Sequence, residues 1–380
     1  MVAVSMPGSG AALGWRDRLR AWQQSLEVDA GFRAWAARFP LTRPIARRRA
    51  RALFDLCAGF VYSQTLLAAV RLRLFETLRD APLPLATIAA RLQLSEAAAG
   101  CLLSATESLR LTARRRDGRH GIGPLGTALL GDPGILAMVE HHATLYRDLA
   151  DPVALLRRDG GGTSLEGYWA YARASAPPDP AGVAAYTALM AATQPMIAAE
   201  ILAAYDFSQH RRLLDIGGGD GSFLAAAGRV APALQLHLFD LPAVLPQAEA
   251  RMGAAGLSGR AQLHGGSFRT DTLPEGCDAI SLVRVVHDHD DAVAQHLLAK
   301  AYAALPAGGR LLVAEPMAET PGAEPMGGAY FGFYLFAMGS GRPRSAAELI
   351  AMLRSAGFGQ VREAPTALPL LTRVLIAEKS

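Results

Sequence analysis

LLDIGGGDGSF, residues 213–223, joins a short apolar run to a glycine-rich turn and then to the start of a helical pattern. A buried strand followed by such a turn lets the backbone approach a ligand with no Cβ in the way, near the N-terminus of the next helix. Asp240 lies 19 residues after Gly221, where the next predicted strand ends. A carboxylate there can accept hydrogen bonds from both hydroxyls of a ribose. The pattern therefore favours a nucleoside-binding turn over a generic tight turn.

The glycine-rich turn also narrows the class of ligand. It reads GGGDG rather than G-x-G-x-x-G, and no stretch resembles a phosphate-binding G-x-x-x-x-G-K-[ST] loop. GIGPLG, residues 121–126, does match G-x-G-x-x-G, but it follows a charged hairpin and contains Pro124, so we predict that it is a loop. An adenosine ligand that needs no phosphate site fits better than NAD or ATP.

The apolar pattern around this turn predicts an α/β fold for the C-terminal half. From about residue 211, short apolar runs alternate with helical stretches, the pattern of βαβ units and a mostly parallel, Rossmann-like sheet. Seven strands are predicted, at residues 212–216, 234–239, 261–264, 279–286, 310–314, 360–363 and 370–377.

The N-terminal half has helical periodicity almost throughout. Residues 85–109 have the pattern of a helix-turn-helix, and residues 111–122 form two short runs around an Asp-Gly turn, as in the wing of a winged helix. Such a module binds DNA in a ligand-sensing regulator, or serves as a dimerisation domain. Residues 96–109, the recognition helix, contain no basic side chain, which argues against DNA.

Composition restricts the class of protein further. The 380 residues are 51% hydrophobic and 19% charged, yet no uninterrupted apolar run reaches the roughly 18 residues of a membrane span. Net charge is +4, but 36 of the 38 basic residues are arginine and most are spread along the chain, so no nucleic-acid partner is predicted. Three widely spaced cysteines indicate neither disulfides nor zinc, and residues 1–15 lack a secretory signal pattern. A cytoplasmic location fits best.

Changes of pattern divide the chain into three segments. Residues 1–49 hold three of the four tryptophans among arginines and read as an amphipathic arm, for which contact with a partner chain, with a membrane surface or with the rest of the chain are open alternatives. Residues 50–160 form the predicted winged-helix dimerisation domain. DGGGTS, residues 159–164, marks the boundary to the predicted catalytic domain, residues 161–380.

Three further motifs give the chain a family resemblance. GGSF follows the third predicted strand at residues 265–268, RVVHDHDD follows the fourth at residues 284–291, and the fifth ends in Glu315-Pro316. With the glycine-rich turn and Asp240, this order resembles the class I S-adenosylmethionine-dependent methyltransferases. It resembles in particular the small-molecule O-methyltransferases that carry an N-terminal winged-helix dimerisation domain. The likeness covers nearly the whole chain and implies S-adenosylmethionine as cofactor and an intertwined homodimer.

The resemblance also implies roles for individual residues. Its cofactor contacts fall on Gly217, Gly219, Asp240, Gly266, Ser267, Phe268 and Arg284. Its general base falls on His287, which suits the chemistry because a neutral alcohol is a poor nucleophile until it loses its proton. Glu315 would orient the imidazole, and Asp288 would support the loop. No metal site is predicted. The acceptor contacts fall on Met190, Tyr330, Tyr334 and Met338.

The acceptor is suggested by departures from the plant members of this family. Ser267 stands where they usually have Asp, and GSGRPR, residues 339–344, lacks the second carboxylate expected near a phenol. Residues 330–338 contain five aromatic side chains, half of which we expect in the core. An apolar pocket without that carboxylate suits a large hydrophobic alcohol better than a polar phenol.

A narrower resemblance points the same way. FPLTRPIARRR at residues 39–49, GFVYSQ at residues 59–64 and AMGSGRPR at residues 337–344 resemble the 1-hydroxycarotenoid O-methyltransferases of purple bacteria. This implies methylation of a tertiary hydroxyl on a membrane-dissolved polyene by an enzyme in the cytoplasm or peripheral to the inner or photosynthetic membrane. O-methyltransferases of an aromatic polyketide, a phenol or a tetrapyrrole would share every cofactor motif and remain alternatives.

Overall fold

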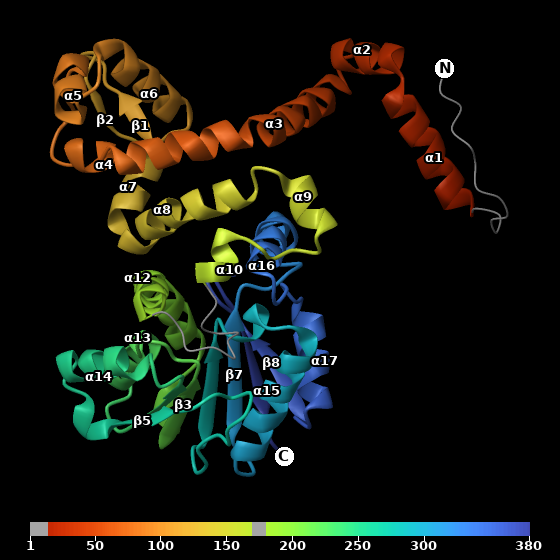
Figure 1. Ribbon diagram of the computed structural model, residues 1–380. Helices are drawn as coiled ribbons and strands as arrows, with labels where there is room; N and C mark the ends of the chain where they lie inside the picture. Colours follow the sequence, from red (N-terminus) through yellow and green to blue (C-terminus); the bar gives the residue numbers. More distant parts are fainter. Residues whose placement is uncertain (1–13, 169–179) are drawn as a thin grey trace.

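The C-terminal half is a seven-stranded sheet in a computed structural model that describes residues 14–168 and 180–380 (Figure 1). The strand order is β5-β4-β3-β6-β7-β9-β8, with β3 to β7 parallel and β9 antiparallel to both of its neighbours. The strands are β3 Arg212–Ile216, β4 Gln235–Asp240, β5 Ala261–Gly265, β6 Ala279–Val283, β7 Arg310–Glu315, β8 Gln360–Ala364 and β9 Arg373–Glu378. The α/β fold is as predicted.

Alternating side chains of the strands pack into two separate hydrophobic cores, one on each face of the sheet. Leu213 packs in a cluster with residues of α12 (Pro180–Ala204), α13 (Ser222–Val230) and α14 (Leu245–Ala254). Its neighbour Leu214 packs with residues of α15 (Asp291–Ala304) and α17 (Ala346–Ser355). Because successive side chains of a strand point to opposite faces, a continuous apolar run is the pattern of a sheet covered on both sides.

The N-terminal half folds around its own core of buried leucines, as the winged-helix pattern predicts. The hairpin β1–β2 is antiparallel, and the Ser95 side chain caps α6 by accepting a hydrogen bond from Ala98 N at 3.1 Å. The elements are α3 Arg43–Arg71, α4 Leu74–Thr77, α5 Leu85–Leu92, α6 Glu96–Ser108, β1 Thr112–Arg114, β2 His120–Ile122, α7 Pro124–Gly131 and α8 Pro133–Asp148.

A smaller cluster joins the two halves. Leu145 of α8 packs with Leu335 and Met338 of α16, together with residues from the short helices between them. Figure 1 shows α16 reaching up from the sheet towards α8 and α10. The elements here are α9 Pro152–Arg157, α10 Ser164–Tyr168, the π-helical turn η4 Met326–Phe331 and α16 Gly332–Met338.

Three predictions of local structure were wrong. Residues 121–126 are not a loop, because they end β2 and begin α7, which has Pro124 in its first turn, where a proline needs no N–H partner. The strand predicted at 279–286 ends at Val283, since Arg284 takes a left-handed φ of 59°. The last strand begins at Arg373 rather than at residue 370, because a turn closed by Leu371 N and Leu368 O precedes it.

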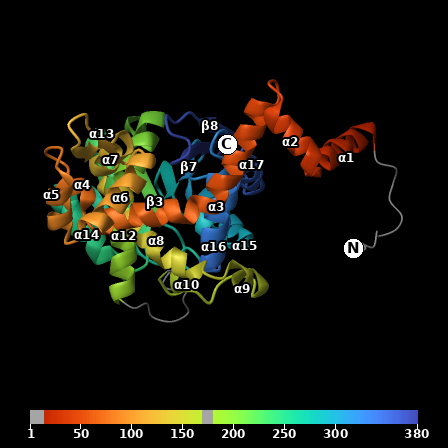
Figure 2. The same cartoon turned by 90° about the horizontal axis from the view of Figure 1, so that it is seen from above.

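The N-terminal arm projects from the body of the molecule (Figures 1 and 2). Its helices α1 (Trp15–Val28) and α2 (Ala30–Arg38) contain no buried residue. Residues 15–38 of the arm therefore do not dock on the rest of the same chain, which excludes one of the three alternatives for these helices. Residues 1–13, which include most of the stretch searched for a secretory signal, lie outside the described residues.

Within residues 14–168 and 180–380, two helices are long and apolar enough to cross a membrane, judged by length and composition alone, although no uninterrupted apolar run is long enough. They are residues 43–71 of α3, with mean hydropathy 1.5 over the best window, and residues 187–204 of α12, with 1.3. Core helices of globular proteins can have the same length and hydropathy, and α12 covers one face of the sheet. Such helices are weak evidence for a membrane span.

Candidate active site

A cleft opens at the carboxyl ends of β3, β4 and β6, where the glycine-rich turn leaves the sheet. Asp240, the last residue of β4, accepts hydrogen bonds from Gly219 N to Oδ2 at 2.8 Å and from Leu241 N to Oδ1 at 2.7 Å. Gly217 N donates to Phe239 O at 2.8 Å. These bonds tie the turn after β3 to the end of β4, so the predicted partners of a nucleoside lie side by side.

Gly217 is the position where the turn requires glycine. Its φ is 69°, and a Cβ built there would lie 2.9 Å from Cγ2 of Val285. A side chain would therefore be strained and would also push on the segment that follows β6. Val285 precedes His287 in the chain. The glycine-rich turn therefore packs against residues 285–291, the histidine loop.

The cleft has an empty volume of about 1000 Å³, including its mouth. All seven predicted cofactor residues border it, and so does Met190. Phe239 and Phe268 supply aromatic walls, while Asp215 and Asp240 supply carboxylates. The seven residues, which stand on β4 and on the three segments that follow β3, β5 and β6, are Gly217, Gly219, Asp240, Gly266, Ser267, Phe268 and Arg284.

Asp215, within the motif that decides the fold, is a site residue that sequence reasoning missed. Its Oδ1 accepts a hydrogen bond from Ser281 Oγ at 2.6 Å, while Oδ2 is buried and has no hydrogen-bond partner among the described residues. Burial raises the pKa of Asp215 to about 7 and that of Asp240 to about 6. Donors or a positive charge on a bound molecule would offset this cost of burial.

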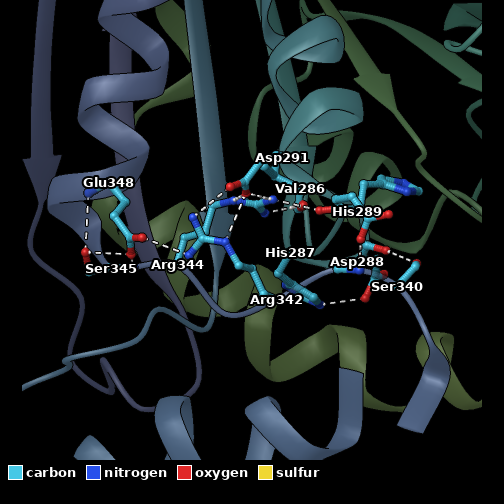
Figure 3. Close-up of polar contacts among 12 residues, drawn as sticks. Val286, His287, Asp288, His289, Asp291, Ser340, Arg342, Arg344, Ser345 and Glu348 are labelled. Atoms are coloured by element: carbon cyan, nitrogen blue, oxygen red, sulfur yellow. Dashed lines mark hydrogen bonds and ion pairs between the residues drawn. The ribbon is translucent and has the colours of Figure 1, made fainter. Parts of the chain in front are cut away.

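His287 lies between two carboxylates in the short helix η3 (Val286–Asp288). Its side chain is almost fully buried, and Nε2 lies 3.0 Å from Asp288 Oδ1 (Figure 3). Its Nδ1 lies 3.5 Å from Oε2 of Glu315, which also accepts a hydrogen bond from His287 N at 3.0 Å. Glu315 is fully buried at the end of β7, so the predicted pair of His287 and Glu315 is brought together.

Asp288 rather than His287 borders the cleft. Burial alone would lower the pKa of His287, but the carboxylates of Asp288 and Glu315 outweigh it and raise that pKa to about 10. The imidazole is thus positively charged near neutral pH, held between two acids. Asp288 was predicted to support the loop, and its direct contact with Nε2 was not foreseen.

Residues of the stretch 340–344 lie around the histidine loop and hold it in place (Figure 3). Arg344 is fully buried and donates to Val286 O at 2.9 Å, to His289 O at 2.7 Å and to Asp291 Oδ1. Arg342 N donates to His287 O at 3.0 Å. Arg342 and Arg344 therefore form an arginine clamp that fixes the backbone on both sides of His287.

The predicted acceptor residues are divided between the cleft and the layer above it. Tyr330 Oη lies 2.8 Å from His142 Nε2, and Tyr334 Oη lies 2.8 Å from His141 Nε2. Neither tyrosine borders the cleft, and Met338 is buried in the core cluster with α8. Burial lowers the pKa of His141 to about 4 and also lowers that of His142, so these pairs are polar but uncharged.

Arg284 contacts α12 at the cleft, and His287 contacts the aromatic layer. Arg284 donates to Thr193 Oγ1 at 2.8 Å and lies 2.8 Å from Met190 Sδ, which joins the end of β6 to α12. The ring centroids of His287 and Phe331 are 5.8 Å apart. The two histidines of α8 gave no signal in the sequence, because their partners are about 190 residues away along the chain.

Comparison with known proteins identifies the family. The model of the O-methyltransferase domain matches residues 146–359, and the model of the O-methyltransferase dimerisation domain matches residues 54–132. The chain belongs to the O-methyltransferase family. The predicted reaction class and cofactor are thereby confirmed: it is an O-methyltransferase that depends on S-adenosylmethionine.

Individual relatives cover most of this O-methyltransferase. It is 44% identical to the demethylspheroidene O-methyltransferase of Cereibacter sphaeroides, over 91% of each chain. It is 43% identical to the enzyme of the same name from Rhodobacter capsulatus, over 90% of this chain and 85% of the relative. Human N-acetylserotonin methyltransferase has the same fold, with a TM-score of 0.73 at 24% identity, covering 87% of this chain and 98% of the human one.

Proposed function

We propose that this enzyme methylates the tertiary hydroxyl of a 1-hydroxycarotenoid of the demethylspheroidene or hydroxyneurosporene type. The observation that carries the proposal is the similarity to two demethylspheroidene O-methyltransferases over about nine tenths of the chain. The aromatic layer of η4 and α16 and the arginine clamp in place of a second carboxylate support an apolar alcohol as acceptor.

The cleft suits S-adenosylmethionine in the chemistry of its lining side chains. We propose that the Asp240 carboxylate accepts hydrogen bonds from the two ribose hydroxyls, because it already lies at the end of β4 beside the turn. Phe239 and Phe268 offer flat walls to the adenine, and the unpartnered Oδ2 of Asp215 offers an acceptor to a cationic amine. The cofactor supplies a methyl group bonded to a positively charged sulfur, which makes that methyl electrophilic.

His287 is the proposed general base. A tertiary hydroxyl attacks as its proton leaves, and the proposed acceptor of that proton is Nε2 of His287, which lies 3.0 Å from Oδ1 of the cleft-lining Asp288. In the proposed mechanism the Asp288 side chain moves away from Nε2, and the loss of that contact lowers the pKa of His287. The Nε2 proton then leaves to solvent, and the neutral imidazole accepts the proton of the acceptor hydroxyl. Glu315 then stabilises the protonated imidazole from the Nδ1 side.

The proposed assembly is a homodimer in the cytoplasm. Its basis is the match to a dimerisation domain, together with exposed apolar residues on α3 within that match, such as Leu56 and Phe60. In this division residues 50–160 associate with a second copy, and residues 161–380 carry out the reaction.

A panel of acceptors tests the proposed substrate. Purified enzyme would be given S-adenosylmethionine labelled in its methyl group and detergent-solubilised acceptors: a 1-hydroxycarotenoid, a catechol, a hydroxylated aromatic polyketide and a tetrapyrrole. We expect label in the carotenoid. Label in another acceptor and none in the carotenoid would refute the substrate but leave the cofactor site intact.

A further inference from the structure

The arm before the dimerisation domain exposes large apolar side chains to an unusual degree. We define the basic arm as residues 15–51, which comprise α1, α2 and the first turns of α3. The exposed fraction is 72% for Trp15, 59% for Trp22 and 50% for Trp35. Exposed tryptophan is costly in water, so a surface that carries three is expected to contact something.

Helical spacing gathers two of these tryptophans on one face. Trp15, Leu19 and Trp22 lie at intervals of four and three residues, which places them in one stripe along α1. At about 100° per residue, Arg16 and Arg18 fall on the two sides of that stripe. A narrow aromatic stripe between arginines is the pattern of a helix that lies at a membrane interface, with the rings at headgroup level and the cations reaching the phosphates.

The arm is a folded unit and not a loose tail. Glu27 at the end of α1 forms an ion pair with Arg49 of α3 at 2.7 Å, and Thr42 Oγ1 donates to Ala36 O at 2.8 Å. The rings of Trp35 and Phe39 stack with their centroids 4.9 Å apart. The ion pair joins α1 to α3 and the hydrogen bond joins the start of α3 to α2, while the tryptophans stay exposed.

Charge is concentrated in the same segment. Residues 15–51 carry ten arginines and three acidic residues, a net charge of +7, whereas the whole chain carries +4. The remainder of the chain is therefore net negative, at −3. Such an asymmetry attracts an anionic surface to the arm and repels it from the body.

The arm is separate from the surface expected to form the dimer. The dimerisation model begins at residue 54, and the exposed apolar residues that follow it on α3 include Phe54, Leu56, Phe60 and Val61. That second surface contains one acidic residue, Asp55, and no arginine between residues 52 and 70. A neutral apolar face suits a second copy of the chain, and the strongly basic arm does not, since two such arms would repel each other.

We propose that the basic arm binds the surface of an anionic lipid bilayer, with α1 lying flat and its tryptophans among the headgroups. Each arginine near such a surface contributes about fivefold to the partition coefficient. The arm would thus keep the catalytic half next to the bilayer. The proposal does not rest on the acceptor, since it concerns residues outside the cleft.

Vesicle flotation of the full-length protein tests this proposal. Vesicles of phosphatidylcholine alone would be compared with vesicles that also contain phosphatidylglycerol, at low salt and at about 0.5 M NaCl, where the Debye length falls to a few ångströms. We expect binding only to the anionic vesicles at low salt. We expect the triple variant Arg16→Gln, Arg18→Gln, Arg20→Gln to reduce the partition coefficient on the order of 100-fold.

Two further variants keep the test specific. Trp15→Ala with Trp22→Ala should also abolish flotation, whereas Arg114→Gln, Arg115→Gln and Arg116→Gln, which neutralise the exposed wing, should leave it unchanged. The oligomeric state of each variant would be measured by light scattering. Equal flotation of wild type and the tryptophan variant would overturn the proposal. Conversion of the dimer to a monomer by that variant would also overturn it, because the arm would then contact a second copy.

Discussion

Replacing Asp288 by Asn should move the pH dependence of catalysis to lower pH. Asp288 Oδ1 lies 3.0 Å from His287 Nε2, and its negative charge helps to raise the pKa of His287 to about 10. The asparagine amide has the same shape but no charge. Since an opposite charge at this distance shifts a pKa by about 1 to 3 units, the variant should lower the pKa of His287 by about that amount.

The sign of the effect follows from the role of the base. Only the neutral imidazole accepts a proton, so the rate should rise with pH as His287 loses its charge. In the wild-type enzyme this rise is expected up to about pH 10, the raised pKa of the free enzyme. In the variant the rising limb should lie about 1 to 3 pH units lower, whatever happens to the height of the plateau.

The assay is kcat/KM for methyl transfer, measured from pH 6 to pH 10.5, because kcat/KM reports the pKa values of the free enzyme. Asp290→Asn is the matched control, since Asp290 is exposed in the same loop and its Oδ1 accepts a hydrogen bond from Gly341 N that an amide oxygen can keep. If the rise of kcat/KM with pH stays in place in the Asp288→Asn variant, or moves to higher pH, the proposed coupling between Asp288 and His287 is refuted.

Four other outcomes are expected. Burial raises the pKa of Asp240 to about 6, so S-adenosylmethionine affinity measured by calorimetry should fall about tenfold per pH unit below that value, and Asp240→Ala should remove the dependence along with most of the affinity. Gly217→Ala, with φ at 69° and Val285 in the way, should weaken cofactor binding and lower the free energy of unfolding by about 1 to 3 kcal/mol, measured by denaturant titration. Arg344→Met should destabilise by about 3 kcal/mol or more, because two backbone carbonyls of the histidine loop lose a charged donor, while Arg344→Lys should recover part of that loss. Tyr330→Phe removes the bond to His142 and should raise the acceptor KM several-fold with cofactor affinity unchanged; an equal change in both would contradict its placement on the acceptor side.

The cofactor side of the site was predictable because its determinants are local. A glycine-rich turn after an apolar run and a carboxylate at the end of the next run are each visible within a few residues, and a parallel sheet brings such strand ends to one edge. Asp215 was overlooked because an Asp within a strand reads as part of the apolar run. Only the sheet register shows that it meets Ser281 at the edge of the cleft.

The acceptor side was harder to predict because its contacts join distant segments. Arg344 reads as one more arginine in an arginine-rich chain, yet it is fully buried under the loop that carries His287. His141 and His142 carry no motif, and they meet Tyr334 and Tyr330 only because α16 packs against α8. A long-range contact also explains why the strand predicted to reach residue 286 ends at Val283: Arg284 leaves the strand and donates a hydrogen bond to Thr193 of α12.

The role of His287 is the central claim and can be tested in one measurement. Single-turnover methyl transfer to the 1-hydroxycarotenoid would be followed in wild-type enzyme and in the His287→Ala variant, with S-adenosylmethionine affinity determined on the same samples. Loss of a general base is expected to slow transfer by about 100-fold or more while the affinity for the cofactor stays within a few-fold. Transfer at the wild-type rate in the variant would contradict the proposed base and, with it, the mechanism.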